Sequence, residues 1–222
     1  MLLGLVGSEM CIRDSASTGS VYGEPKVFPT TEEHALDPVS YYGVSKLAGE
    51  RYVNTFHHLY GIKTTILRYF HVYGDRQESN EFGGVVSIFT RNVLNKEPLM
   101  VNGHGEQMRT FTWVKDLVKA NLLAVGSDIS VGKVYNVASS IQVTINDLAK
   151  NIKSMMQSDS EILHNEPLLG DIMYFDVSND AIVKDLGMSF TQDFWGKLEV
   201  ILKDIVESIK EQFHRYMKTI SY

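Results

Sequence analysis

The chain has 222 residues, 44% hydrophobic and 22% charged, which is typical of a soluble globular protein long enough to bury a core. Its formal net charge of −6 argues against nucleic acid as a partner, because nucleic-acid-binding surfaces are basic. No apolar run approaches the roughly 20 residues that span a bilayer, so no membrane association is expected. The single cysteine, Cys11, excludes an internal disulfide framework and predicts a cytoplasmic location, where thiols stay reduced.

The first residues differ from the rest of the chain. Residues 4–15 resemble translated sequencing-adapter read-through. A signal peptide is excluded, because the start carries no basic residue and its apolar run is interrupted by glycines and polar residues. Cys-Ile-Arg-Asp-Ser, residues 11–15, is not expected to form a strand. We therefore interpret residues 1–15 as a foreign leader.

Small hydroxyl residues follow in residues 16–23, Ala-Ser-Thr-Gly-Ser-Val-Tyr-Gly, where a strand is predicted to end. Two interpretations of Ser17 and Thr18 are open. Their hydroxyls can bond the local backbone, as such side chains often do at strand ends. Alternatively, the Thr18 hydroxyl binds the reacting hydroxyl of a substrate.

A helix is predicted from about Ser40 to Tyr60, after a polar loop that contains prolines. Tyr42 and Lys46 are four residues apart, so their side chains project from the same helix face. An ammonium group near a phenol favours the phenolate and lowers the phenol pKa from about 10 toward neutral. Tyr42 is thus a candidate general base for a substrate hydroxyl, although the pattern alone does not exclude an ordinary surface pair.

Residues 61–70 are rich in β-branched side chains and are predicted to form a buried parallel strand. Ligands of open α/β sheets bind beyond the carboxyl ends of the strands, so residues 69–74 are expected to border the site. The later chain is predicted to contain helices over 83–94 and 116–125, strands over 132–138 and 161–164, and helices that begin at Thr144 and Ser178. A long terminal helix carries an apolar stripe interpreted as packing, namely Trp195, Leu198, Leu202, Ile205, Ile209 and Phe213. His57 and His58 lack metal-ligand spacing, and no metal is expected.

Three segments together, residues 16–23, the Tyr42–Lys46 motif and residues 64–74, resemble the extended short-chain dehydrogenase/reductases. The resemblance is to the NAD-dependent epimerase/dehydratase family, nearest to its UDP-glucose 4-epimerase branch. It implies that Thr18, Tyr42 and Lys46 form the catalytic group, and that Lys46 also binds the ribose of an NAD cofactor. The implied activity is epimerisation at C4 of a nucleoside-diphosphate sugar.

The resemblance also implies binding residues. Tyr69 and Phe70 would join Tyr42 and Lys46 beside the cofactor, although ordinary strand-end packing is an equal alternative for the two aromatic residues. The residues implied to bind the nucleotide sugar are Ser17, Thr18, His71, Arg109 and Asp171, with Arg109 gripping a phosphate.

The chain departs from the family pattern at several of these positions. His71 stands where the family usually has Asn, and Leu168 where it has an Arg that grips the second phosphate. Sugar-nucleotide dehydratases carry Asp-Glu after the threonine, whereas this chain has Gly19 and Ser20, which disfavours a dehydratase.

The implied fold class is α/β, the C-terminal part of a doubly wound Rossmann-type sheet plus a smaller mixed substrate-binding domain. Residues 16–75 would form the second half of the NAD-binding domain. Residues 76–222 would be mainly the substrate-binding domain, with 111–138 returning to the sheet. No G-x-G-x-x-G or G-x-x-G-x-x-G turn occurs, which indicates an N-terminally truncated chain.

The resemblance further implies a homodimer formed through the helix of Tyr42 and its neighbour. Two alternatives to the epimerase remain open. One is another NAD-linked sugar-nucleotide enzyme, a decarboxylase or a reductase. The other is an inactive fragment that lacks the phosphate-binding turn.

Overall fold

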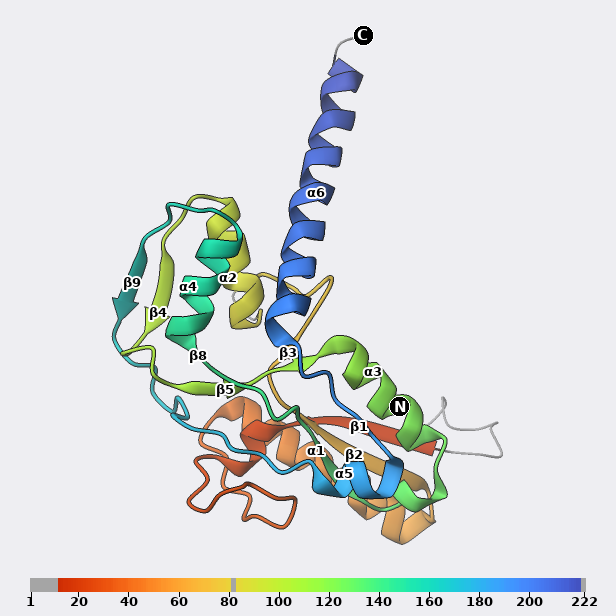
Figure 1. Ribbon diagram of the computed structural model, residues 1–222. Helices are drawn as coiled ribbons and strands as arrows, with labels where there is room; N and C mark the ends of the chain where they lie inside the picture. Colours follow the sequence, from red (N-terminus) through yellow and green to blue (C-terminus); the bar gives the residue numbers. More distant parts are fainter. Residues whose placement is uncertain (1–11, 81–82, 221–222) are drawn as a thin grey trace. The chain divides into compact units, whose positions relative to one another are not determined.

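The computed structural model describes residues 12–80 and 83–220 (Figure 1). It divides into two compact units, each described by itself. The first contains residues 12–72, 107–143 and 168–192, and the second contains the rest of the described chain. The sequence-based division gave only residues 111–138 of the later chain to the first domain, whereas the compact first unit also takes in 168–192.

The elements of the first unit are β1 (Ile12–Thr18), the 3₁₀ helix η1 (Gly19–Tyr22), α1 (Tyr41–Tyr60), β2 (Lys63–Tyr69), β5 (Met108–Thr110), β6 (Thr112–Trp113), α3 (Val114–Val125), the 3₁₀ helix η2 (Asp128–Ser130), β7 (Val134–Val137) and α5 (Asp180–Leu186). Those of the second are α2 (Val85–Leu94), β4 (Leu99–Asn102), α4 (Ile145–Met155), β9 (Ile162–Asn165) and α6 (Phe194–Ile220). Two short strands lie where the chain passes between the units, β3 (Val72–Tyr73) and β8 (Gln142–Thr144).

A parallel sheet of order β1-β2-β7 forms the centre of the first unit. Its register sets Thr18 opposite Tyr69 and Ile66 opposite Val134. Parallel strands need crossover connections, and α1 supplies one of them between β1 and β2. The predicted α/β class with a Rossmann-type sheet is confirmed.

The strand β1 begins earlier than the sequence predicts. Ile12 to Ser15 pair with Lys63 to Ile66 of β2, so the expectation that these residues form no strand is wrong. Main-chain pairing with a neighbouring strand does not require apolar side chains, and composition therefore missed it. Residues 1–11 lie outside the described part of the chain, and the foreign origin of residues 1–15 stays a prediction.

Helices cover both faces of this sheet. Successive side chains of a strand point to opposite faces, and β2 shows this alternation. Leu67 packs with Ala120 and Ala124 of α3, whereas the next residue, Arg68, reaches Glu50 of α1. The helices α1 and α3 therefore lie on opposite sides of the sheet (Figure 1).

Local signals at both ends define α1, and its predicted extent is confirmed. The Ser40 hydroxyl accepts a hydrogen bond from the Gly43 amide at 3.1 Å, which satisfies one of the free N–H groups of the first turn. At the other end Gly61 adopts the left-handed conformation with a φ of 65° and donates to the His57 carbonyl.

The predicted start of α5 needs a small correction. Asn179 is its N-cap, and Ser178 stands one position earlier. The Ser178 hydroxyl nevertheless accepts a hydrogen bond from the Asp180 amide at 3.2 Å, which is the capping bond that its side chain was expected to make.

In the second unit β4 and β9 pair in parallel, and the predicted cap of α4 is confirmed by the Thr144 hydroxyl, which accepts from the Asp147 amide at 3.0 Å. Leu198 and Leu202 of α6 are buried, as the apolar stripe predicts. No helix in the described parts of the chain is long and apolar enough to cross a membrane. Across residues 12–80 and 83–220, no group of three or more His, Cys, Asp or Glu side chains is arranged to hold a metal ion.

Candidate active site

Tyr42 and Lys46 lie close together on the first turns of α1. The Lys46 Nζ atom lies 5.7 Å from the centroid of the Tyr42 ring and donates a hydrogen bond to the Ala16 carbonyl at 3.3 Å. Tyr42 is 55% exposed, so its ring is not part of the core. The predicted proximity of ammonium and phenol is therefore present, on a surface that a ligand can reach.

A glycine brings this part of α1 against the end of β1. A Cβ atom at Gly43 would lie 2.7 Å from the Ser20 carbonyl oxygen in η1 and 2.9 Å from Cβ of Pro38. Any larger residue would push the helix away from the segment that follows Thr18. The absence of a side chain at Gly43 thus lets the first turn of α1 approach η1, the segment that follows Thr18 directly.

The Thr18 hydroxyl makes local hydrogen bonds. Its oxygen accepts from the Ser20 amide at 3.2 Å and lies 3.3 Å from the Ser20 hydroxyl oxygen, to which it donates. This is the backbone interaction that is common at strand ends. A contact between Thr18 and a substrate stays a prediction.

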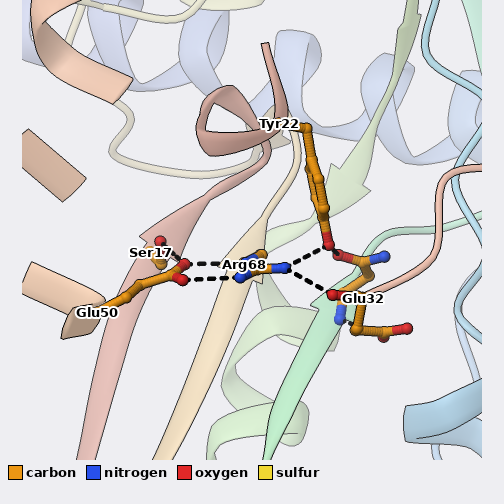
Figure 2. Close-up of polar contacts among 6 residues, drawn as sticks. Ser17, Tyr22, Glu32, Glu50 and Arg68 are labelled. Atoms are coloured by element: carbon orange, nitrogen blue, oxygen red, sulfur yellow. Dashed lines mark hydrogen bonds and ion pairs between the residues drawn. The ribbon is translucent and has the colours of Figure 1, made fainter. Parts of the chain in front are cut away.

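Ser17 belongs to a buried polar network that the sequence did not predict (Figure 2). Its hydroxyl donates to Glu50 Oε1 at 2.5 Å. The Arg68 guanidinium donates to the same carboxylate through Nε at 2.9 Å and through Nη2 at 2.7 Å. Glu50 is 2% exposed and Arg68 3%, so both charges are fully buried. The structure therefore gives the Ser17 hydroxyl a protein partner, and its contact with substrate stays a prediction.

The network continues on the other side of Arg68. Nη1 of Arg68 donates to the Tyr22 hydroxyl at 2.7 Å, and Tyr22 donates to Asn136 Oδ1 at 2.7 Å. Burial raises the pKa of Tyr22 to about 12, so the phenol keeps the proton that it donates. Burial acts to lower the pKa of Arg68, but the interactions with Glu50 and Tyr22 together outweigh it and leave the pKa raised.

Two sequence signals pointed to this network without being recognised. Arg68 is a charged residue that follows a run of apolar and β-branched residues, Thr64 to Leu67, in the predicted strand. Glu50 follows Lys46 by four residues and so lies on the same face of α1. A buried charge needs a partner, and an opposite charge on the helix next to that strand was the natural candidate.

Tyr69 and Phe70 both have packing partners. The Tyr69 hydroxyl donates to Asn121 Oδ1 at 2.9 Å. Phe70 is buried against Tyr22 and Phe175, with ring centroids 6.4 and 5.7 Å away. Their strand-end packing is thus present, and their contact with a cofactor stays a prediction.

Arg109 and Asp171 are brought together from segments 62 residues apart, where they form an ion pair. Nη1 of Arg109 also donates to the Ile172 carbonyl at 2.6 Å and to the Met108 carbonyl at 2.9 Å. Burial lowers the pKa of Arg109, while the Asp171 carboxylate opposes this change. Leu168, which stands in place of the family's arginine, is exposed.

His71 stands at the carboxyl end of β2 in an unusual conformation. Its φ of 32° is in the left-handed region that few side chains adopt without a specific reason. The Nδ1 atom is buried without a hydrogen-bond partner in the described part of the chain. Burial, together with the Arg109 cation, lowers the pKa of His71 to about 3 despite a hydrogen bond with the Thr110 backbone. The imidazole is therefore neutral at pH 7.

This shift predicts a pH-dependent stability. Between pH 6.5 and 3 the unfolded chain binds a proton at His71 that the folded protein excludes, so stability is full above pH 6.5 and falls below it. The free energy of unfolding should drop by about 1.6 kcal/mol between pH 6.5 and pH 5 because of this one group. Urea denaturation at both pH values should show that His71→Asn removes this drop, whereas the control His58→Asn, at an exposed position, leaves it. An equal pH dependence in wild type and His71→Asn would contradict the prediction.

Comparisons with known proteins identify the family of the chain. Residues 15–138 match the model of the NAD dependent epimerase/dehydratase family. The chain is 36% identical over 165 residues to a putative UDP-glucose 4-epimerase of Methanocaldococcus jannaschii, covering 73% of this chain and 53% of that protein. It is also 36% identical over 106 residues to a UDP-N-acetyl-alpha-D-glucosaminuronate decarboxylase of Bacillus cytotoxicus, covering 48% and 33% of the two chains.

Among solved structures, UDP-glucose 4-epimerase of Thermotoga maritima with UDP-glucose superposes with a TM-score of 0.84 at 33% identity. That superposition covers 90% of this chain and 64% of the other. The chain thus spans about half the length of the M. jannaschii relative and under two thirds of the T. maritima structure.

Proposed function

Since the chain belongs to the NAD-dependent epimerase/dehydratase family, we propose that it inverts the configuration at C4 of a nucleoside-diphosphate sugar. The observation that carries this proposal is the placement of the Tyr42–Lys46 turn against the segment that follows Thr18, through the close contact of Gly43 with Ser20. In this proposal the phenol, the ammonium group and the hydroxyl share one edge of a parallel sheet, where such sheets bind ligands.

Each of these three side chains has a distinct task in the proposed reaction. Tyr42 accepts the proton of the sugar 4-hydroxyl and later returns it to the same oxygen. Lys46, whose ammonium lies over the Tyr42 ring, favours the phenolate. Thr18 donates a hydrogen bond to the oxygen that changes state. The two proton transfers cancel over one turnover, as an epimerisation requires.

The residues of this edge fit one end of an NAD molecule. An ammonium group has three N–H donors, and the Ala16 carbonyl takes one from Lys46, which leaves donors for ribose hydroxyls. The exposed phenol of Tyr42 stands beside it. When bound, NAD supplies the hydride acceptor and donor that inversion at a carbinol carbon requires.

The nucleotide sugar is proposed to bind through Arg109, Asp171 and His71. A guanidinium has five N–H donors, and the bonds to Asp171 and to the Ile172 and Met108 carbonyls use three, which leaves Arg109 able to bind a phosphate oxygen. The neutral imidazole of His71 offers hydrogen-bonding capacity at its unpartnered Nδ1 atom. Leu168 cannot replace the charged contact of an arginine. We therefore expect a lower affinity for the second phosphate of the nucleotide sugar.

A dehydratase is disfavoured by packing as well as by residue type. A Cβ atom at Gly19 would lie 2.2 Å from Cε1 of Phe70, which is itself buried. The aspartate that dehydratases carry at this position would not fit without moving the Phe70 ring. The packing at Gly19 therefore supports a reaction other than water elimination, because the acid/base pair for that reaction is absent.

Product analysis tests the proposal. The protein, and any longer reading frame that contains this chain, is incubated with NAD and a panel of UDP-hexoses and UDP-hexuronic acids. Interconversion of 4-epimers without net NADH formation is expected. Carbon dioxide release from a UDP-uronic acid would favour the decarboxylase, which the similarity to the B. cytotoxicus enzyme keeps open.

The alternative from a different class is a non-catalytic protein, because the sequence contains no Gly-rich phosphate-binding turn. Titration with NAD, followed by protein fluorescence, separates the two. Saturable binding supports the enzyme, and its absence in every form of the protein would leave only the non-catalytic interpretation.

A homodimer is proposed on the exposed apolar side chains of α1. They are Val44, Tyr52, Phe56, Leu59 and Tyr60. Side chains of this kind on one helix are unusual for a monomer surface and suit a self-complementary helix pairing. Light scattering should give twice the mass of one chain.

A further inference from the structure

Three residues on the face of α1 that touches the sheet make contacts with it or with η1, and the number of hydrogen bonds increases along the helix. Gly43, Lys46 and Glu50 follow one another at spacings of three and four, so they share one side of the helix. Gly43 approaches the Ser20 carbonyl, Lys46 bonds the Ala16 carbonyl, and Glu50 receives three hydrogen bonds from Ser17 and Arg68. Glu50 is therefore the most strongly held of the three.

The partners of Glu50, Ser17 and Arg68, lie one position before Thr18 and its strand partner Tyr69. In the register of β1 and β2, Ser17 lies opposite Arg68, and the next pair is Thr18 opposite Tyr69. A single carboxylate from α1 thus joins both strands one residue before Thr18. Any slip of the helix along the sheet would break these bonds before it moved Tyr42 by one helical turn.

Arg68 also holds the segment after Thr18. It donates a hydrogen bond to the Tyr22 hydroxyl in η1, the 3₁₀ helix that follows Thr18 directly. The Tyr22 hydroxyl in turn donates a hydrogen bond to Asn136 of β7. Figure 2 shows Arg68 between Glu50 on one side and Tyr22 on the other. The Arg68 guanidinium therefore connects α1, which carries Tyr42 and Lys46, to η1, the segment that follows Thr18.

We propose that Glu50 and Arg68 are positioning residues that hold Tyr42 and Lys46 of α1 in register with Thr18 of β1. Both residues are buried, so we assign them a role that does not require contact with the sugar or the cofactor. This inference rests on the proposed function for its effect on turnover, but its geometric part concerns the folded chain alone.

The variant Glu50→Gln tests it with two measurements. Amide hydrogen exchange of residues 41–46 should accelerate more than that of the remainder of α1. In turnover, kcat should fall by about 10²-fold, the loss expected from a misplacement of about 1 Å. KM for the nucleotide sugar should change little.

The matched control is Asp116→Asn. Asp116 of α3 is also a buried carboxylate that accepts two hydrogen bonds, from the Thr191 amide at 2.7 Å and the Thr191 hydroxyl at 3.2 Å. It should reduce stability without changing exchange at residues 41–46 or kcat. If Glu50→Gln does not fold, Tyr22→Phe, which keeps the ring and removes the Arg68 acceptor, should cause the same changes to a smaller extent.

Equal exchange at residues 41–46 in Glu50→Gln and Asp116→Asn would overturn the inference. So would an equal loss of kcat in the two variants, because a loss of stability alone would then explain it. A wild-type protein without turnover on any sugar nucleotide would count against the proposed function, and the exchange measurement would still decide the positioning role.

Discussion

Replacing Tyr42 with Phe is expected to lower kcat by about 10²–10⁴-fold, the contribution typical of a positioned general base. The substitution removes the phenol oxygen and keeps the ring that lies 5.7 Å from Lys46 Nζ. Because Tyr42 is 55% exposed, the core is unaffected and the free energy of unfolding should not change. NAD binding should be retained, since Lys46 and the sheet edge remain in place.

The measurement combines the UDP-hexose interconversion assay with a fluorescence titration of NAD. Tyr41→Phe is the matched control. Tyr41 is the neighbouring residue in the same turn and is 97% exposed, so its hydroxyl should be dispensable. Full turnover in Tyr42→Phe would show that the base assignment is wrong, and a loss in both variants would indicate damage to α1 instead.

The second large effect is expected on stability. Arg68→Met should reduce the free energy of unfolding by about 3–5 kcal/mol, the usual result of leaving one member of a buried ion pair alone. The reason is that Glu50, fully buried, then keeps a charge that only the Ser17 hydroxyl compensates. Denaturation by urea at pH 7 measures the loss.

A double-mutant cycle separates the ion pair from its surroundings. Adding Glu50→Leu to Arg68→Met removes the uncompensated charge, so the double variant should be destabilised by less than the sum of the single ones, with a coupling of about 1–3 kcal/mol. Lys63→Met is the control, because it opens the exposed Lys63–Asp128 pair, whose atoms are 2.6 Å apart, and should cause no measurable change. Additive losses in the cycle would contradict the assigned coupling.

Where a signal was local, the sequence-based predictions agree with the structure. Ser40, Gly61 and Thr144 define helix ends through bonds within a few residues, and these ends were predicted correctly. The start of β1 was missed because its pairing partner lies 51 residues along the chain, Ile12 opposite Lys63. Capping depends on neighbours in sequence, whereas strand pairing depends on neighbours in space.

The contacts of the candidate site likewise separate into local ones, which the sequence predicted, and long-range ones, which it did not. The spacing of Tyr42 and Lys46 predicted their proximity, since a helix brings side chains four residues apart together. The ion pair of Arg109 with Asp171 and the buried network of Arg68 with Glu50 join residues 62 and 18 positions apart. Neither pairing follows from periodicity, because loops and strand order decide which segments meet.

By itself, the sequence determined the α/β class, the helix that carries Tyr42 and Lys46, and the family motifs around Thr18 and residues 64–74. Helical periodicity and capping are encoded in consecutive residues and need no knowledge of the rest of the chain. Only the tertiary structure decided that Ser17 faces Glu50, that Phe70 fills the space beside Gly19, and that His71 is buried and neutral. These properties depend on packing between distant segments, which sets the burial and the partners of each polar group.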